Sequence, residues 1–341
     1  MRLSRVLPGL LLLFAACASE TRPPYLDVGV APPIIPSTGG DAGSNPDTGG
    51  SDGAAGTLTS ELNARGVSLA GGYAYVTVQN TGAATGTLSR VATLGAAPED
   101  LVPDLTEPWA VVASPTHVTF STVRGSDGGG GVYDLVLGTT TVTTLAAATV
   151  DAYGLATDVS NAYFTDSSAG LGVERRALSG TGAERIASSG MLTAGNALVL
   201  SGTDLFVAAA NGVVYTAPVA GGVLEPLDVP LAYPLADLVV IGSTIYAALD
   251  AATPNGAIVT FPRAGGAAQT YVGSLDHPAH LATDGIRLYW TSPTAGTVSS
   301  VSLTIASDVQ TVATNLTTPL AIAVADAVYV TTADALLKLP K

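Results

Sequence analysis

A short strand pattern built around one aromatic residue recurs seven times along this chain and constrains its fold more than any other feature. Successive copies are 40 to 45 residues apart, and the aromatic residues are Tyr75, Phe120, Tyr163, Phe206, Tyr246, Tyr289 and Tyr329. Apolar and polar residues alternate through these copies, which is typical of a β-strand. A repeat of this length is typical of one four-stranded blade of a β-propeller. The sequence therefore predicts an all-β fold, a seven-bladed β-propeller.

The residues around each aromatic strand supply the other three strands of a blade. An apolar strand precedes the aromatic one, as at 320–324, and a weaker fourth strand ends the unit, as at 309–312. Between them lies a third strand that usually opens with a glycine, and these glycines are Gly86, Gly131, Gly172, Gly212, Gly256 and Gly296. Each repeat therefore holds four strands, the number that a propeller blade needs.

The last repeat lacks a fourth strand, because the chain stops at Lys341 after the third. Residues 57–62 precede Tyr75 by 18 positions, and 311–316 precede Tyr329 by the same 18 positions. We therefore expect 57–62 to complete the last blade and close a ring over 57–341. Closure of this kind removes exposed sheet edges, which otherwise promote aggregation.

Two of the aromatic strands have a family resemblance. Tyr289-Trp290-Thr291, and less closely Tyr163-Phe164-Thr165-Asp166, resemble the repeats of the YWTD and NHL families of β-propellers. The resemblance covers most of 57–341 and implies fold more than function, because propellers carry many unrelated activities. We interpret the repeated aromatic residues as packing residues between neighbouring blades.

The first 17 residues have the pattern of an export signal. Arg2 and Arg5 precede an apolar run over 6–16 that is too short for a permanent membrane span, which predicts a signal peptide over 1–16. The run ends in Leu13-Phe14-Ala15-Ala16-Cys17, which resembles the lipobox of bacterial lipoproteins.

That resemblance implies that Cys17 is lipidated, with palmitate-type acyl chains, and becomes the mature N-terminus. Ala18 after the cysteine resembles the outer-membrane sorting pattern, so the expected location is the cell envelope, anchored to the outer membrane. The alternative is cleavage at Ala16-Cys17-Ala18 as an A-x-A site, which gives a soluble secreted protein.

Residues 17–56 begin with the lipidated cysteine and continue as a linker rich in Gly, Pro and Asp. This composition cannot bury a core, so we expect a disordered tether. A coil of about 39 residues spans roughly 30–40 Å. The predicted organisation is therefore a signal peptide over 1–16, the lipidated cysteine and linker over 17–56, and the propeller over 57–341.

Charge and metal-ligand content narrow the function. The 27 acidic residues outnumber the 13 basic ones, and only two of the latter are lysines, which argues against a nucleic-acid partner. One cysteine and three histidines are few ligands for a metal centre, so we expect no cofactor and assign no metal ligand. We also expect a monomer.

Candidate binding residues lie in the loops that join one blade to the next, around the central channel. One ring level there is predicted to hold mostly small residues, with one histidine: Ser68, Ala110, Gly154, Asn196 or Ala197, Ala236, His280 and Ala321. His277 shares a loop with His280, and Trp109, Tyr153 and Tyr233 occupy comparable loops. The predicted ligand-binding residues are therefore His277, His280, Trp109, Tyr153 and Tyr233.

Other interpretations of the histidines stay open. In one interpretation, His277 and His280 are hydrogen-bonded structural residues. In another, they form a metal or acid–base site with Asp276 and Asp284. His117 is expected in a turn away from this ring.

We assign no catalytic residues. The function that this pattern favours is an envelope-anchored propeller that binds or scaffolds a protein, peptide or glycan. The alternative is a metal-assisted lyase or hydrolase that works from the channel face.

Overall fold

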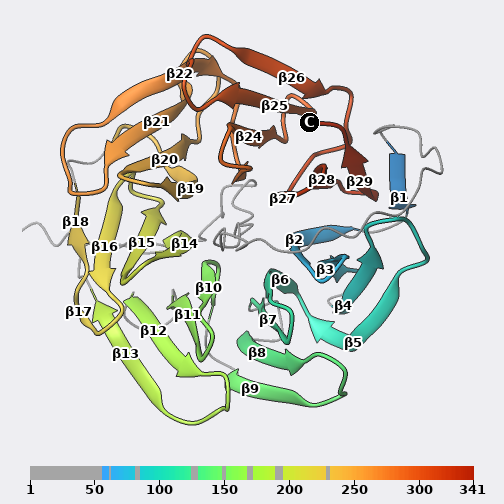
Figure 1. Ribbon diagram of the computed structural model, residues 1–341. Helices are drawn as coiled ribbons and strands as arrows, with labels where there is room; N and C mark the ends of the chain where they lie inside the picture. The colour runs from blue at the N-terminus through green and yellow to red at the C-terminus, as the bar shows by residue number, and fades with distance from the viewer. Residues whose placement is uncertain are drawn as a thin grey trace, which may run out of the picture.

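Seven β-sheets stand around a central axis in the computed structural model of the chain (Figure 1). It describes residues 56–60, 63–80, 85–123, 130–147, 151–166, 172–188, 195–227 and 231–341. The fold is the predicted seven-bladed β-propeller of four-stranded antiparallel blades, and the described residues contain no helix. The predicted signal peptide, Cys17 and all of the predicted linker except Gly56 lie outside the described residues.

The first three blades follow one another along the chain. Blade 1 consists of β2 (Ala64–Ala70), β3 (Tyr73–Gln79), β4 (Thr85–Ala92) and β5 (Glu99–Thr106). Blade 2 consists of β6 (Pro108–Ala113), β7 (His117–Thr122), β8 (Gly131–Val136) and β9 (Val142–Ala146). Blade 3 consists of β10 (Leu155–Thr157), β11 (Asn161–Asp166), β12 (Gly172–Ala177) and β13 (Ala183–Ser188).

Blade 4 consists of β14 (Gly195–Ser201), β15 (Asp204–Ala209), β16 (Val214–Pro218) and β18 (Glu225–Pro226), and its short β17 (Gly222–Val223) pairs in parallel with β13 of blade 3. Blade 5 consists of β19 (Leu235–Ile241), β20 (Thr244–Leu249), β21 (Gly256–Pro262) and β22 (Gln269–Leu275). Blade 6 consists of β23 (Leu281–Thr283), β24 (Arg287–Ser292), β25 (Thr297–Ser302) and β26 (Val309–Ala313).

Blade 7 joins the two ends of the ring. Its inner strands are β27 (Ile322–Val324), β28 (Val328–Thr331) and β29 (Ala335–Leu339), and its outer strand is β1 (Gly56–Ser60). β1 runs antiparallel to β29, with Gly56 opposite Lys338 and Ser60 opposite Ala335. The predicted closing strand is thus confirmed, although it begins one residue earlier than expected.

The repeated aromatic residues are buried and pack between blades, as expected. Tyr75 of blade 1 packs against Val111 and Val118 of blade 2, and Tyr163 of blade 3 packs against Leu198 of blade 4. Side chains of this kind supply the core of the ring, because neighbouring blades stack face to face.

Blade 2 departs from the predicted repeat by one residue. Phe120 shares a core cluster with Tyr75, so it faces blade 1, whereas Tyr163 faces the blade that follows it. Thr119, not Phe120, therefore occupies the position in β7 that corresponds to Tyr75 in blade 1 and Tyr163 in blade 3. A shift of one residue turns a side chain to the other face of its sheet, so the sequence alignment placed Phe120 on the wrong side of its blade.

In blades 1, 2 and 3, a hydroxyl group two residues after the position of Tyr75 and Tyr163 links the inner strand of the blade to that of the next blade. In blade 1, the backbone N–H of Gly66 donates to Thr77 Oγ1 at 2.9 Å, and this hydroxyl donates to the carbonyl oxygen of Trp109 in blade 2 at 2.5 Å. Ser121 and Thr165 make the same two contacts in blades 2 and 3. These hydroxyls join the inner strands of blades 1 to 4 around the channel.

We expect Thr77→Val to lower the free energy of unfolding by about 2–3 kcal/mol, because the buried N–H of Gly66 and carbonyl of Trp109 each lose a partner. Valine has nearly the same shape, so packing stays unchanged. Urea denaturation of the purified protein measures the effect, and Thr77→Ser, which keeps the hydroxyl, is the control. Equal losses in both variants would show that the methyl group and not the hydroxyl matters.

Candidate functional site

The loops of the propeller divide between two faces. Because neighbouring strands in a blade are antiparallel, the loops joining second to third strands and those joining one blade to the next lie at the same end, here called the top face. The hairpins joining first to second and third to fourth strands lie at the other end, the bottom face. Of the predicted ligand-binding residues, His277 and Tyr233 lie in top-face loops, and Trp109, Tyr153 and His280 lie at the top ends of inner strands or just before them.

His280 lies directly before β23 and is buried, with 1% of its surface exposed. Its backbone N–H donates to Thr291 Oγ1 at 3.2 Å, so it occupies the same place in blade 6 as Gly66 does in blade 1. Its imidazole Nδ1 lies 3.8 Å from Oδ2 of Asp237 in blade 5. The ring histidine therefore faces a carboxylate of the neighbouring blade.

Asp237 is a residue that the sequence analysis missed. Its carboxylate accepts hydrogen bonds from the backbone N–H of Leu238 at 2.7 Å and of Leu281 in blade 6 at 2.9 Å. Burial raises the pKa of Asp237, although His280 and the two N–H groups act in the opposite direction. The carboxylate of Asp237 thus joins the inner strands of blades 5 and 6. In blades 1 to 3 a hydroxyl group makes this link, but blade 5 has Ala248 at the corresponding position.

The observed ring level differs from the predicted one in two blades. Strand register places Gly66 and Asp237 at this level instead of Ser68 and Ala236. The predicted list was wrong there because each inner strand carries an irregularity just before this level, as between Leu235 and Asp237. An acid inside the apolar run 235–240 was the signal that could have pointed to Asp237.

His277 and Tyr233 occupy one repeated position in the top-face loops, directly before a proline. Glu107 and Thr318 occupy it as well, and all four follow a Leu-x-x-Pro pattern that begins at Leu105, Leu231, Leu275 and Leu316. In each loop, the leucine contacts the glycine near the start of the third strand. It either pairs with this glycine in the sheet or donates its backbone N–H to the carbonyl oxygen of the glycine. The sequence analysis did not recognise this pattern, which holds the loops in a common frame.

The two candidate residues at this position differ in their contacts. His277 has a left-handed backbone, with φ of 44°, and its Nδ1 lies 2.7 Å from Oδ1 of Asp250 in the loop between β20 and β21. Tyr233 is 36% exposed. Both side chains are thus presented at the top face, one of them held by a neighbouring acid.

Trp109 and Tyr153 contact each other across blades 2 and 3. Their rings meet edge to face, with centroids 5.5 Å apart and planes at 82°. The guanidinium carbon of Arg65 lies 5.9 Å from the centroid of the Trp109 ring. Each of these three residues directly precedes the ring-level residue of its blade. Trp109 is only 7% exposed, so its ring is mainly a packing residue.

Charge is unevenly divided between the two faces in the described part of the chain. Several acids lie at the top face or toward it, namely Asp104, Glu107, Asp151, Asp250, Asp276 and Asp334. Of the described arginines and lysines, Arg65 and Arg185 lie toward that face, and Arg185 forms an ion pair with the buried Asp166 at 2.8 Å. The top face is therefore acidic.

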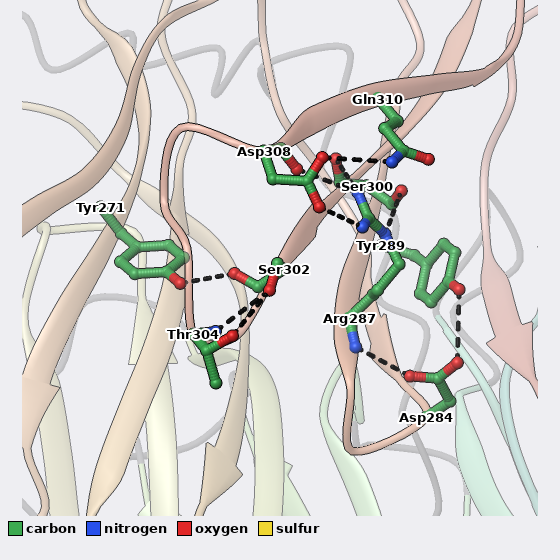
Figure 2. Close-up of polar contacts among 9 residues, drawn as sticks. All are labelled: Tyr271, Asp284, Arg287, Tyr289, Ser300, Ser302, Thr304, Asp308 and Gln310. Carbon is green, nitrogen blue, oxygen red and sulfur yellow. Dashed lines mark hydrogen bonds and ion pairs between the residues drawn. The ribbon is translucent and has the colours of Figure 1, made fainter.

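The bottom face is held by polar turns, of which the one in blade 6 is drawn in Figure 2. Asp284 accepts hydrogen bonds from the backbone N–H groups of Ile286 and Arg287 and from the hydroxyl of Tyr289. The Arg287 guanidinium pairs with Asp308 at 2.6 Å. His117 also lies at this face, with Nδ1 2.6 Å from Oδ2 of the buried Asp134, away from the ring level as expected.

We expect the Asp284 turn to lose its contribution to stability in acid. Burial acts to raise the pKa of Asp284, but N–H groups of Arg287 and Ile286 and the Lys341 ammonium outweigh it and hold the pKa below its usual value. The folded protein therefore binds this proton less readily than the unfolded chain, so the contribution is present above about pH 4 and falls as the pH drops through the folded pKa.

Urea denaturation of wild type and Asp284→Asn at several pH values between 7 and 3 tests this. The variant should be less stable at pH 7, and the gap should narrow toward pH 3. A gap that does not change with pH would contradict the prediction.

Among the described residues, the candidate histidines do not belong to a cluster of possible metal ligands. Within the part of the chain that the structure describes, no group of three or more His, Cys, Asp or Glu side chains is placed to hold a metal ion. The Asp276 and Asp284 considered with the histidines lie on opposite faces, because Asp276 precedes β23 and Asp284 follows it. No described helix is long and apolar enough to cross a membrane.

Comparisons with known proteins show the fold alone. No protein-family model matches the sequence, and no curated protein matches it. Virginiamycin B lyase from Staphylococcus aureus is similar in structure, with a TM-score of 0.67 and 11% identity, over 84% of this chain and 97% of that one. A streptogramin B lyase gives a TM-score of 0.66 and 13% identity, over 84% and 97%. A chain of a nidogen–laminin complex gives 0.52 and 19%, over 64% and 85%.

Proposed function

We propose that this protein is a lipoprotein of the cell envelope, anchored through Cys17, whose propeller binds a protein or peptide partner at its top face. The observation that carries the binding role is the repeated loop position before proline. The Leu-x-x-Pro motif recurs in four loops, and the residue before the proline changes from Glu107 to Tyr233, His277 and Thr318. Three of these residues, Glu107, His277 and Thr318, share a left-handed backbone. A rigid frame that displays different side chains is the usual design of a recognition surface.

The chemistry of the top face favours a partner with lysine or arginine side chains. Acids such as Asp250 and Asp276 lie beside the presented residues, and few basic groups accompany them in the described residues. An exposed tyrosine such as Tyr233 also accepts a cation over its ring. A basic protein segment therefore fits better than a neutral glycan, which remains a weaker candidate.

A binding role is better supported than catalysis. His280, the ring histidine, is buried against Asp237, and His277 is held by Asp250. The metal-assisted lyase or hydrolase alternative is supported by a likeness in fold to two lyases at 11% and 13% identity, which carries no active-site residue to this chain.

The binding proposal is tested by recovering partners from envelope extract with the tagged protein at equal folded concentration. Tyr233→Ala combined with Asp276→Asn should reduce recovery of the partner by about tenfold or more, because residues at the centre of an interface contribute about 2 kcal/mol or more. Ile305→Ala, on the bottom face and 56% exposed, is the matched control. Recovery should also fall as salt rises. Equal recovery with both variants would move the binding surface elsewhere.

The anchor is tested separately by feeding cells a labelled fatty acid. Label should enter the wild-type protein and be absent from Cys17→Ser. A wild-type product that begins at Ser19 and carries no label would overturn the anchor and leave the binding proposal standing.

A further inference from the structure

We propose that the bottom face of the propeller rests on the surface of the lipid bilayer that holds its anchor. This inference depends on the proposed acylation of Cys17. It assigns a second surface to the protein, opposite to the one proposed to bind a partner.

Exposed apolar side chains are concentrated on the bottom face. Among the described residues, Leu94 and Val159 are more than nine-tenths exposed and Ile286 is 73% exposed, and each lies in a bottom-face hairpin. Ile305 lies in another such hairpin, and Val142 and Val309 open strands that leave bottom-face hairpins. In the described part of the chain, the remaining large exposed apolar residues are Val223, at the outer edge in β17, and Tyr233, on the top face.

The arrangement of these side chains favours a flat occupant. They belong to hairpins, or to strands that leave hairpins, of blades 1, 2, 3 and 6, so they do not come from one compact part of the ring. A folded partner of ordinary size covers a compact area with a continuous apolar centre. A bilayer surface is a plane, and it receives separate apolar side chains at many points at once.

The charges of the bottom face are largely neutralised by one another. Five of the described basic side chains of this face are held in ion pairs, between Arg90 and Glu99, Arg263 and Asp204, Arg287 and Asp308, Lys338 and Asp326, and Lys341 and Asp284. The top face instead carries acids with few basic partners. An anionic lipid surface repels the acidic face and tolerates the balanced one, which orients the propeller bottom face down.

The chain reaches the propeller at this same face. Gly56, the first residue of β1, lies opposite Lys338, near the end of β29 that leaves at the bottom face. The 39 residues 17–55 precede it in the chain. The coil that the sequence predicts for this length spans roughly 30–40 Å. Because the chain enters the propeller at Gly56 on the bottom face, this point of attachment leaves the apolar hairpins nearest the membrane.

A fluorescent label at single cysteines of the acylated protein tests the orientation. Acylation consumes the Cys17 sulfur, so Ile286→Cys gives one labelling site on the bottom face, and Thr317→Cys gives a matched exposed site on the top face. The protein is reconstituted in vesicles of phosphatidylethanolamine and phosphatidylglycerol that contain a nitroxide-bearing lipid. The label at 286 should lose most of its emission, and the label at 317 should keep most of it.

Equal quenching at the two sites, or stronger quenching at 317, would overturn the proposal while the anchor stands. Leu94→Asn combined with Val159→Asn should reduce quenching at 286 severalfold without reducing flotation of the protein with the vesicles. A dimer on the vesicles with both labels unquenched would show that a second copy covers the face, which also overturns the proposal. Protein that does not float and that labels at Cys17 would instead show failure of the proposed anchor.

Discussion

Deletion of β1, residues 56–60, is expected to destabilise the propeller by about 5 kcal/mol, or roughly 10 °C or more in Tm. β1 supplies the outer ladder of blade 7, and Leu58 packs against the core cluster shared by blades 1 and 7. Without it, β29 becomes an exposed edge. Differential scanning calorimetry should show the lower Tm, and light scattering should show aggregation, since an open edge pairs with other chains.

A deletion of the same length upstream, residues 41–45 in the predicted linker, is the control. It shortens the chain before the propeller without removing a described strand, so its Tm should match that of the parent. If the β1 deletion also melts like the parent, the closure of the ring by β1 contributes nothing to stability.

Replacement of Gly86 by alanine is expected to cost about 3 kcal/mol or more. A Cβ at Gly86 would lie 2.1 Å from the carbonyl oxygen of Val78 and 2.6 Å from Cγ of Pro108, so backbone and a rigid ring would both have to move. The same crowding exists at Gly256, where the neighbours are the carbonyl oxygens of Ala251 and Leu275. The recurring glycines that open third strands are therefore required by the backbone that passes over them.

Gly273→Ala is the matched control, because its nearest neighbour is a methyl group of Thr270 at 3.4 Å, an ordinary contact. Urea denaturation of the two variants should show a large loss for Gly86→Ala and a change within about 0.5 kcal/mol for Gly273→Ala. Equal losses would mean that the loss of glycine in a strand, and not the clash, determines the effect.

The blade count and the closing strand could be predicted from the sequence because both depend on spacing. Seven aromatic strands recur at a blade's length, and 57–62 matches 311–316 in its offset. Spacing does not specify register to one residue. Phe120 is the clear case, since Thr119 and Phe120 both suit a strand, and only the contact of Ser121 with Ala110 shows which of them holds the repeat position.

The candidate site was predicted less well for a related reason. Sequence alignment placed Ala236 where Asp237 stands, because it could not count the irregular residue between Leu235 and Asp237 in β19. The contact between His280 and Asp237 joins residues of two blades, and no local pattern announces such a pair. The aromatic pair of Trp109 and Tyr153 was foreseen as two loop residues, and its edge-to-face contact appeared only in the structure.

The sheet that unites β1 with β27, β28 and β29 also sets the order in which the molecule can be completed. Its first strand begins at Gly56 and its last ends at Leu339, so this sheet contains the first described residue of the chain and nearly the last. The four strands of every other blade come from one stretch of the chain. The seventh blade must wait for the final strand, and until then β1 remains without its partner. Closing the arc of blades into a ring thus depends on one long-range pairing, that of β1 with β29.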